Sequence, residues 1–381
     1  MSSACYTVVS LTVNGLKAAD IQHLLRQKIA VLTGGRDKHG RPIISCLWRE
    51  NAEKTSLEEL RVVLLYLHTI PSDETKEGGF VVLIDMRHGL TWNAVKPILK
   101  ILQDHFPGMV HNVYITKPDR FWEKHRANIS SAKYKFEVQT VAVENLPKYI
   151  DVGQLTQEFD GTLHYDNEEW LELRIALEDL IWRCLDVLRV LESIKEELET
   201  AQLPTDVDSA REALDALTAL RKRISKAAVD SLEHEGHQLV HRLTGGALNP
   251  AGLNAAGVNQ GDVGEGGSTT ADSDYGSGGG RDSLGCQVNP DFATAAPNVL
   301  TLLENLRGTR ADLQNRWQAR KAKLDQAFQL QLFQQDADKM FGSIRDSIEC
   351  FLVTYAEVGE TQEAALALQA QREEFTHSDG T

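Results

Sequence analysis

The sequence predicts an α/β domain followed by a region of long helices. Between residues 29 and 165, short apolar runs alternate with charged stretches that contain Gly and Pro, which is typical of strands and helices in alternation. After Trp170 comes a long segment with almost no Gly or Pro, in which Leu recurs every three or four residues, as in amphipathic helices that pack together. At 381 residues the chain is long enough for more than one hydrophobic core.

The first half contains the runs expected of strands and helices in a sheet. Residues 29–48 hold two β-rich runs on either side of a Gly-containing charged turn, which predicts a hairpin. Ser56 is a suitable N-cap for a helix that stops before Pro71. Residues 78–89 hold a continuous apolar run between glycines, as expected for a strand that is buried on both faces.

The pattern continues with an amphipathic helix over residues 92–106, a β-branched strand over 109–118, a short helix over 120–129 and a strand over 135–143. Pro97 is a misfit inside the first of these helices because proline lacks the backbone N–H. Strands that alternate with helices predict an α/β sheet with partly parallel pairing.

The sequence of the second half predicts three long helices. In the first, over residues 170–201, the apolar residues alternate steps of four and three as in a heptad seam: Leu173, Leu177, Leu180, Cys184, Val187, Leu191, Ile194 and Leu198. Pro204 ends this helix, and Thr205 or Asp206 can cap a second one that we expect to run to Gly245. The third has no Gly or Pro between Thr309 and Phe341.

Residues 245–297 have the composition of a disordered linker. They contain 13 of the 28 glycines of the chain, and their only aromatic residues are Tyr275 and Phe292. Because such a segment cannot bury a core, we expect an unstructured insert between the second and third helices.

Composition restricts the environment and the partners. The formal net charge of −15 argues against a broadly basic surface that binds nucleic acid. The five cysteines form no Cys-x-x-Cys pair, which suits a reducing compartment. Aliphatic-aromatic runs such as that at 80–84 are far shorter than a membrane span, and the N-terminus lacks the early positive charges of a signal peptide. We therefore expect a cytoplasmic protein.

Patterns that carry catalysis are missing. The Gly-rich stretch "GGRDKHG" lacks the Lys-Ser/Thr of a phosphate-binding loop, and no Gly-x-Ser-x-Gly elbow occurs. His105, His111 and His125 lack the spacing of a helical metal site. Asp85 follows a buried strand but has no evident partner base or nucleophile, so we interpret it as a structural carboxylate. We expect no catalytic residue, no metal ligand and no cofactor.

Four motifs in the first half occur in a familiar order: "DKHGRPI", "LIDMRHG", "HFPGMVHNVYITKP" and "LTQEFDGTL". In this order they resemble the CRAL-TRIO lipid-binding domain over residues 29–165. The resemblance implies a hydrophobic lipid pocket that a mobile helical gate closes. Residues 1–28 form a short N-terminal extension in place of the family's helical subdomain, and little chain remains for a gate between residues 122 and 136.

A phosphoinositide or an anionic membrane is therefore the expected partner of this half. Basic and aromatic residues that fit an anionic bilayer interface are Lys117, Arg120, Phe121, Trp122, Lys124, Tyr134 and Lys135. The alternative, which we favour, is a solvated helix whose Phe121 and Trp122 pack on the sheet.

The second half resembles spectrin repeats, which are three-helix bundles whose third helix continues into the next repeat. Tryptophans occur in the first helix, at Trp170 and Trp182, and in the third, at Trp317. We expect one repeat over residues 166–341, with the Gly-rich insert at 245–297, and an incomplete second repeat over 336–381. The surface of the repeats would bind protein partners.

A CRAL-TRIO-like domain joined to spectrin repeats resembles the N-terminal region of the Trio and Kalirin family, and "KLDQAFQLQLFQQDADKMF" resembles that family's helix junction. These are guanine-nucleotide exchange factors for Rho-family GTPases in actin remodelling and axon guidance, and their exchange modules lie further downstream. The expected function is therefore a non-catalytic regulatory and scaffolding region, cytoplasmic and peripheral at the plasma membrane. The alternatives are a stand-alone phospholipid-binding adaptor with CRAL-TRIO and spectrin domains, and a lipid-transfer protein. We also expect the chain to be a fragment, splice form or truncated gene model.

Overall fold

The computed structural model describes residues 15–47, 56–87, 92–117, 134–245 and 288–378. Contacts divide the chain into two compact units. The first comprises Met1–Arg189 with Ala228–Thr309, and the second Val190–Ala227 with Arg310–Thr381. The first unit thus contains the expected α/β domain together with helical segments that follow it in the chain.

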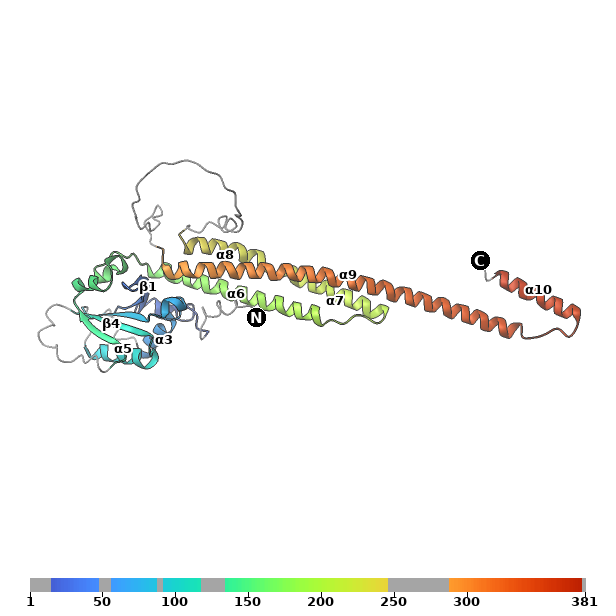
Figure 1. Cartoon of the computed structure of the whole chain (residues 1–381), viewed down its shortest axis with the longest axis horizontal. Helices are drawn as coiled ribbons and strands as arrows, with labels where there is room; N and C mark the ends of the chain where they lie inside the picture. Colours follow the sequence, from blue (N-terminus) through green and yellow to red (C-terminus); the bar gives the residue numbers. More distant parts are fainter. Residues whose placement is uncertain (1–14, 48–55, 88–91, 118–133, 246–287, 379–381) are drawn as a thin grey trace, which may run out of the picture. The chain divides into compact units, whose positions relative to one another are not determined.

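The first unit is built on a five-stranded sheet in the order β1-β2-β3-β4-β5 (Figure 1). β1 (Val31–Arg36) and β2 (Pro42–Cys46) form the predicted antiparallel hairpin. β3 (Phe80–Asp85), β4 (Val110–Thr116) and β5 (Glu137–Val141) continue the sheet with parallel pairing. The expected α/β class of this half is confirmed.

Both faces of the sheet are covered, which explains why every residue of β3 is buried. On one face, Phe80 and Val82 lie beside apolar residues of α3 (Leu57–Leu67) and α5 (Trp92–His105). On the other face, Val81 and Leu83 pack in a core with residues of two short 3-10 helices, η5 (Val143–Lys148) and η7 (Gln157–Phe159), and with Leu155, which follows a third, η6 (Val152–Gln154). The sheet is therefore the middle layer of the unit.

A local signal sets the start of α3. The Ser56 side chain accepts the N–H of Glu59, and the Glu59 carboxylate accepts the N–H of Ser56, forming a capping box. The predicted N-cap is confirmed. There are two shorter helices: α2 (Gln22–Leu25) precedes β1, and α4 (Asp73–Lys76) follows α3.

Three helical segments complete the first unit: the first part of α6 (Asn167–Thr200), α8 (Val229–Leu243) and the start of α9 (Pro290–Thr354). Gly236 of α8 lies so close to Leu303 of α9 that a Cβ atom at Gly236 would lie 2.5 Å from Leu303 Cδ1. Arg183 of α6 donates to Glu235 of α8 at 2.5 Å. These contacts hold the three segments together as a bundle.

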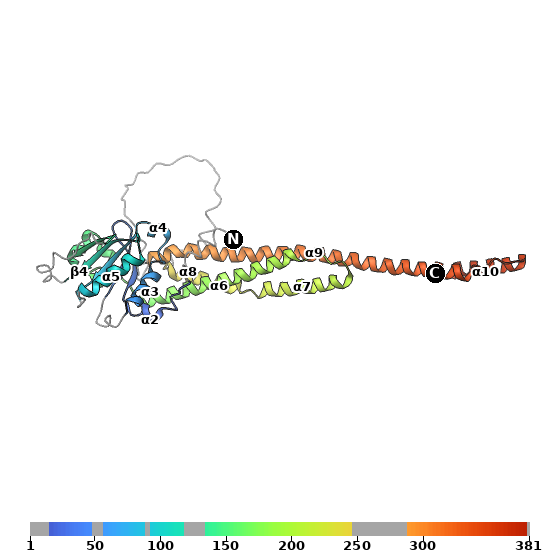
Figure 2. The ribbon, with the colours of Figure 1, turned by 90° about the horizontal axis from the view of Figure 1, so that it is seen from below.

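The second unit also packs three helical segments: the end of α6, α7 (Val207–Lys226) and the middle of α9 (Figure 2). The indole Nε1–H of Trp317 on α9 donates to the carbonyl of Leu217 on α7 at 2.7 Å. Arg320 of α9 donates to the carbonyls of Ala201 and Gln202, just past α6. A final helix, α10 (Gln362–Ser378), follows α9.

Two helix boundaries differ from the sequence-based expectation. The second helix is divided in two, because α7 ends at Lys226 and Ala227 has an extended backbone with ψ of 126°. No Gly or Pro marks this break, and the new helix α8 begins with the fully buried Val229, so tertiary packing overrides local propensity. The third helix begins at Pro290, inside the expected linker, and contains Pro297.

Candidate functional site

The carboxyl ends of β3 and β4 carry a buried polar cluster, at the edge where open α/β sheets commonly bind ligands. Asp85 ends β3 and is 2% exposed. Its Oδ1 accepts Arg87 Nε at 2.9 Å and the hydroxyl of Thr116 at 2.9 Å. Arg87 also donates to the carbonyl of Glu158. The cluster therefore ties β3 and β4 to η7.

Opposing effects set the pKa of Asp85. Burial raises the pKa of this carboxyl, but the hydrogen bonds from Arg87 and Thr116 outweigh burial, so that the pKa lies below its ordinary value of 3.8. The hydrogen bond to Asp85 in turn raises the pKa of Arg87. Both groups stay charged near neutral pH, as a structural ion pair requires.

Lys117 follows β4 at the same edge. It is 7% exposed, and its Nζ lies 5.4 Å from the centroid of the Trp92 ring, within the range of a cation–π contact. Burial lowers the pKa of this ammonium group. The side chain is thus a buried cation at the carboxyl ends of the strands.

Tyr134 and Lys135 lie at the opposite end of the strand pair. β4 and β5 run parallel in register from Asn112 opposite Glu137 to Thr116 opposite Val141, so these two residues precede β5 whereas Lys117 follows β4. The ring of Tyr134 stacks on that of Phe136 at 5.5 Å, and Lys135 is exposed. The structure therefore does not bring Lys117 to the other two.

The remaining residues predicted to contact lipid lie outside the described residues: Arg120, Phe121, Trp122 and Lys124. The short helix expected over residues 120–129 lies there as well. The predicted patch therefore remains an expectation for these positions.

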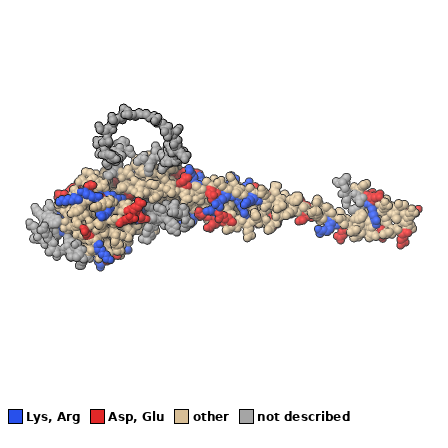
Figure 3. Space-filling view, in the orientation of Figure 1, with Lys and Arg blue, Asp and Glu red and all other residues tan. Residues whose placement is uncertain are grey.

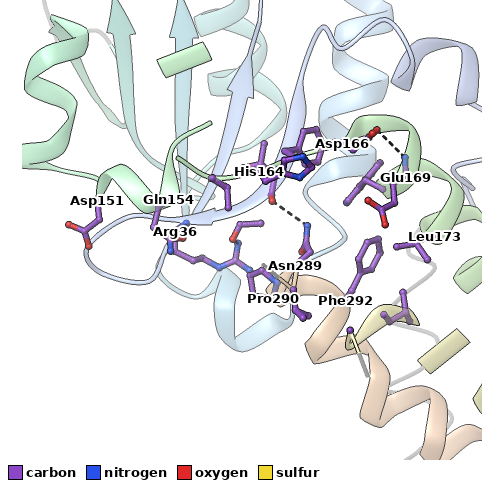
Figure 4. A pocket seen from close by; sticks show the side chains of 18 of the residues that line it. Arg36, Asp151, Gln154, His164, Asp166, Glu169, Leu173, Asn289, Pro290 and Phe292 are labelled. Atoms are coloured by element: carbon purple, nitrogen blue, oxygen red, sulfur yellow. Dashed lines mark hydrogen bonds between the residues drawn. The ribbon is translucent and has the colours of Figure 1, made fainter. Parts of the chain in front are cut away.

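The first unit also contains a cavity of about 550 Å³ between the turn after β1, the segment before α6, the end of α8 and the start of α9 (Figure 4). The apolar part of its wall is formed by Leu163, Tyr165, Trp170, Leu173, Leu243, Val288, Pro290 and Phe292. The Trp170 and Phe292 rings lie 6.4 Å apart. Its volume falls within the roughly 300–1,000 Å³ of small-molecule sites in proteins.

Charged residues surround this apolar wall. The cations are Arg36, Lys38 and Arg242, and the carboxylates are Asp37, Asp151, Asp166 and Glu169. Three of the carboxylates are already engaged: Asp37 pairs with Arg41, Asp151 with Lys38, and Asp166 accepts the N–H groups of Glu168 and Glu169 at the start of α6. Lys38 is paired only at 3.8 Å, with Asp151.

The start of α9 closes one side of the cavity. Asn289 caps the helix by accepting the N–H of Asp291 at 3.0 Å, and it donates to the carbonyl of Thr33 at 3.3 Å. Asp291 forms an ion pair with Arg36. Gly34 has φ of +86°, and a Cβ atom there would lie 2.8 Å from Asn289 Oδ1, so this close approach requires glycine.

Sequence reasoning missed this cavity. A signal was nevertheless present, because Asn289-Pro290-Asp291 is a typical helix start: an N-cap, a proline in the first helical position and an acid in the first turn. The contact with Arg36 carried no local signal, because it joins residues that are far apart in the chain.

Within the parts of the chain that the structure describes, no group of three or more His, Cys, Asp or Glu side chains has a metal-binding arrangement. Among the described helices, none combines the length and the apolar character that crossing a membrane requires.

Comparisons with known proteins agree with this architecture. Residues 40–168 match the model of the divergent CRAL/TRIO domain. SEC14 domain and spectrin repeat-containing protein 1 of Mus musculus is 39% identical over 170 residues, which cover 43% of this chain and 24% of that protein. The Danio rerio protein of the same name is 29% identical over 369 residues, 94% of this chain and 45% of that protein.

Exchange factors are also among the relatives. Guanine nucleotide exchange factor DBS of Homo sapiens is 27% identical over 353 residues, covering 91% of this chain and 28% of that protein. The chain spans less than half the length of each of these three relatives. The expected combination of a CRAL-TRIO domain with spectrin-repeat and exchange-factor relatives is confirmed.

Proposed function

Because residues 40–168 match the model of the divergent CRAL/TRIO domain, we propose that the chain is a lipid-responsive regulatory and scaffolding region of the kind found in Rho-family exchange factors, as the Trio/Kalirin resemblance implies. Its role is non-catalytic. The CRAL/TRIO unit binds an anionic phospholipid such as a phosphoinositide, and the helical surfaces bind proteins of cytoskeletal and axon-guidance signalling. Its place is the cytoplasmic face of the plasma membrane.

The observation that carries the lipid proposal is the cavity of about 550 Å³. Its wall joins apolar side chains to three cations and four carboxylates, and the apolar side chains with the cations could hold an amphipathic anion. Lys38 lies 3.8 Å from Asp151 and Arg242 lies 3.1 Å from Glu172, but the two cations keep 42% and 52% of their side-chain surface exposed, from which they can also meet a charged headgroup. The apolar part of the ligand then lies against Trp170 and Phe292.

Native mass spectrometry of the full chain, incubated with a short-chain phosphoinositide, tests this proposal. We expect a bound lipid that is lost in Leu173→Trp, because the larger ring fills the cavity. The double change of Lys38→Glu with Arg242→Glu removes two cations. At about 1 kcal/mol for each cation that meets an anionic headgroup, the affinity falls by roughly thirtyfold.

A matched control reverses two exposed cations of α5, Lys96→Glu with Lys100→Glu, and should bind lipid as the parent chain does. Retention of lipid by Leu173→Trp, with a circular dichroism spectrum like that of the parent, would contradict the assignment to this cavity. If the control and the variant that carries Lys38→Glu with Arg242→Glu lose the same affinity for the lipid, the loss is an effect of net charge alone.

A second candidate is a stand-alone phospholipid-binding adaptor. It is favoured by the Danio rerio relative, named for SEC14 and spectrin domains, whose match extends over 94% of this chain. The transcript downstream of residue 381 separates the two candidates, since an exchange domain there supports the first and a stop codon without one supports the second.

A further inference from the structure

A buried ion pair holds the start of α9 to the end of β1. Arg36, the last residue of β1, pairs with Asp291 in the first turn of α9. The side chain of Asp291 is 2% exposed and that of Arg36 is 18% exposed. A carboxylate that is buried so deeply depends on its partner, because a buried charge without one is costly. The ion pair therefore helps to decide whether the start of α9 keeps its place.

The ion pair uses only one side of the carboxylate. Oδ1 of Asp291 accepts the Arg36 guanidinium, whereas Oδ2 is buried and has no hydrogen-bond partner among the described residues. The Nη1 group of Arg36 donates to the carbonyls of Gly34 and Gly35 at 3.3 Å each, slightly beyond the usual range of about 2.7–3.2 Å. Two parallel hydrogen bonds to one acceptor group are the stronger arrangement for a guanidinium. Asp291 thus holds Arg36 with less than the full strength of such a pair.

Arg36 also belongs to the wall of the cavity of about 550 Å³. Asn289, Pro290 and Phe292 line the same cavity, and Figure 4 shows their side chains together with that of Arg36. The backbone N–H of Arg36 donates to Gln154 Oε1 at 2.9 Å, which fixes the base of the side chain. A ligand in the cavity therefore meets the guanidinium and the start of α9 at the same time.

The other cations of the cavity differ from Arg36 in exposure. Lys38 and Arg242 also pair with protein carboxylates, but their side chains are 42% and 52% exposed. On the face of the first unit that Figure 3 shows, Lys and Arg side chains lie beside Asp and Glu side chains in the same way. Water weakens such exposed pairs, whereas the pair of Arg36 with Asp291 is shielded from water. The strongest competition between an anionic ligand and a protein carboxylate therefore occurs at Arg36.

We propose that Asp291 is a built-in competitor of the anionic ligand, and that binding of the ligand to Arg36 releases the start of α9. The inference rests on the proposed function, since its ligand is the phosphoinositide of that proposal. A phosphate monoester carries about −1.5 to −2 charges near neutral pH and can accept two parallel hydrogen bonds from a guanidinium. It thus replaces the one-sided bond of Asp291. The displaced carboxylate is then a buried charge without a partner, and it leaves its position together with the first turn of α9.

The proposal gives the first unit a regulatory step. Coupling between two sites is reciprocal: if the ligand loosens the start of α9, a change that frees Arg36 from α9 must strengthen the ligand. Lipid binding is thereby converted into a change at the beginning of the longest helix of the described chain. The phosphate monoester is the group that produces this change, because it is the part of the ligand that binds Arg36.

The affinity of the full chain for a short-chain phosphoinositide, measured by isothermal titration calorimetry, tests the competition. We expect Asp291→Asn to bind the lipid more tightly than the parent chain by roughly tenfold, within the roughly 5–150-fold that is usual for coupled sites. A carboxylate with a purely structural role predicts no such gain. Glu168→Gln is a matched control, because it also removes a carboxylate at the start of a helix. Glu168 is exposed and pairs with Arg26 outside the cavity wall, so this variant should bind as the parent chain does.

Hydrogen exchange tests the release of α9. The first backbone N–H groups of α9, at residues 291–293, all donate to oxygens of Asn289, so their exchange reports on this turn. We expect the lipid to raise the exchange of these amides, whereas a ligand that only fills the cavity would lower it. Arg36→Gln should raise the same exchange without any lipid. The measurement with lipid uses the parent chain and does not depend on the folding of a variant.

The outcomes separate this inference from the proposed function. If neither the parent chain nor Asp291→Asn binds the lipid, the proposed function fails and the competition fails with it. If both bind the lipid with equal affinity, or if the lipid lowers the exchange at the start of α9, the proposed function stands and the competition is wrong. Unchanged exchange in Arg36→Gln would likewise overturn the proposal, because the ion pair would then not hold the helix start.

Discussion

At the scale of single residues, the buried charges of the first unit are paired through specific hydrogen bonds. Glu178 of α6 accepts the hydroxyl of Tyr66 at 2.7 Å, Arg174 Nε at 2.9 Å and the backbone N–H of Ala18 at 2.7 Å. Arg174 is 2% exposed and also donates to the Tyr66 oxygen. Because a buried charge without partners is costly, this network fixes how α3, α6 and the segment around Ala18 pack.

Asp85 gives a residue-scale prediction for stability against pH. Its pKa is lowered in the folded chain, so its ionised form stabilises the fold above about pH 4, and this contribution is lost as pH falls through the folded pKa. We expect Asp85→Asn to lower the free energy of unfolding at pH 7, by roughly 1–3 kcal/mol for a broken charged hydrogen bond.

The difference between Asp85→Asn and the parent chain should shrink as the pH falls below 4, which urea unfolding at several pH values measures. Asp104→Asn, at the end of α5, serves as a control for the loss of one carboxylate. If Asp85→Asn and the parent chain differ in free energy of unfolding by the same amount at acid and neutral pH, the ionised carboxylate does not stabilise the fold.

At the scale of elements, α6 is the helix whose character the sequence predicts best. The seam residues Leu177, Leu180, Cys184 and Leu191 are all 2% exposed or less. The predicted cap of α7 also exists, since Asp206 accepts the N–H of Ser209 at 2.8 Å. Both features depend on a few neighbouring residues, which is why periodicity and capping rules find them.

The seam of α6 predicts the effect of truncating a side chain. Leu180 is 2% exposed, so Leu180→Ala should leave a cavity and lower the free energy of unfolding by roughly 2–5 kcal/mol. Val190→Ala, at a position on the same helix that is 49% exposed, should change it by less than about 0.5 kcal/mol. Urea unfolding of both variants measures the difference, and equal effects would mean that the seam is misassigned.

At the scale of the whole molecule, charge governs any approach to a membrane. The formal net charge of −15 opposes adsorption to an anionic surface. Any attachment would therefore need a local group of cations with aromatic anchors. The predicted group is Arg120, Lys124 and Lys135 with Phe121 and Trp122. Of these, Lys135 is among the described residues and is exposed.

We expect the full chain to sediment with vesicles that contain an anionic phospholipid at low salt, and more weakly at physiological salt. The triple change of Arg120, Lys124 and Lys135 to Glu should abolish this binding, because each cation near the surface contributes about 1 kcal/mol. The exposed cations Arg189, Arg211 and Lys321, changed to Glu together, provide a control of equal net charge. Binding that survives the first triple change would remove this patch from consideration.

The sequence by itself determined the features whose cause is local. The hairpin of residues 29–48, the capped helix after Ser56, the buried strand at Phe80 and the seam of α6 each follow from alternation, helical period or capping within a few residues. The family resemblance likewise depended on short motifs in a fixed order.

Tertiary structure alone decided the candidate site. The cavity needs Arg36 beside Asp291 and Trp170 beside Phe292, pairs separated by more than a hundred residues. The strand register decided that Lys117 and Lys135 lie at opposite ends of the sheet, and packing divided the second helix at Ala227. Such features depend on which distant surfaces meet when the core is buried, and no window of neighbouring residues contains that information.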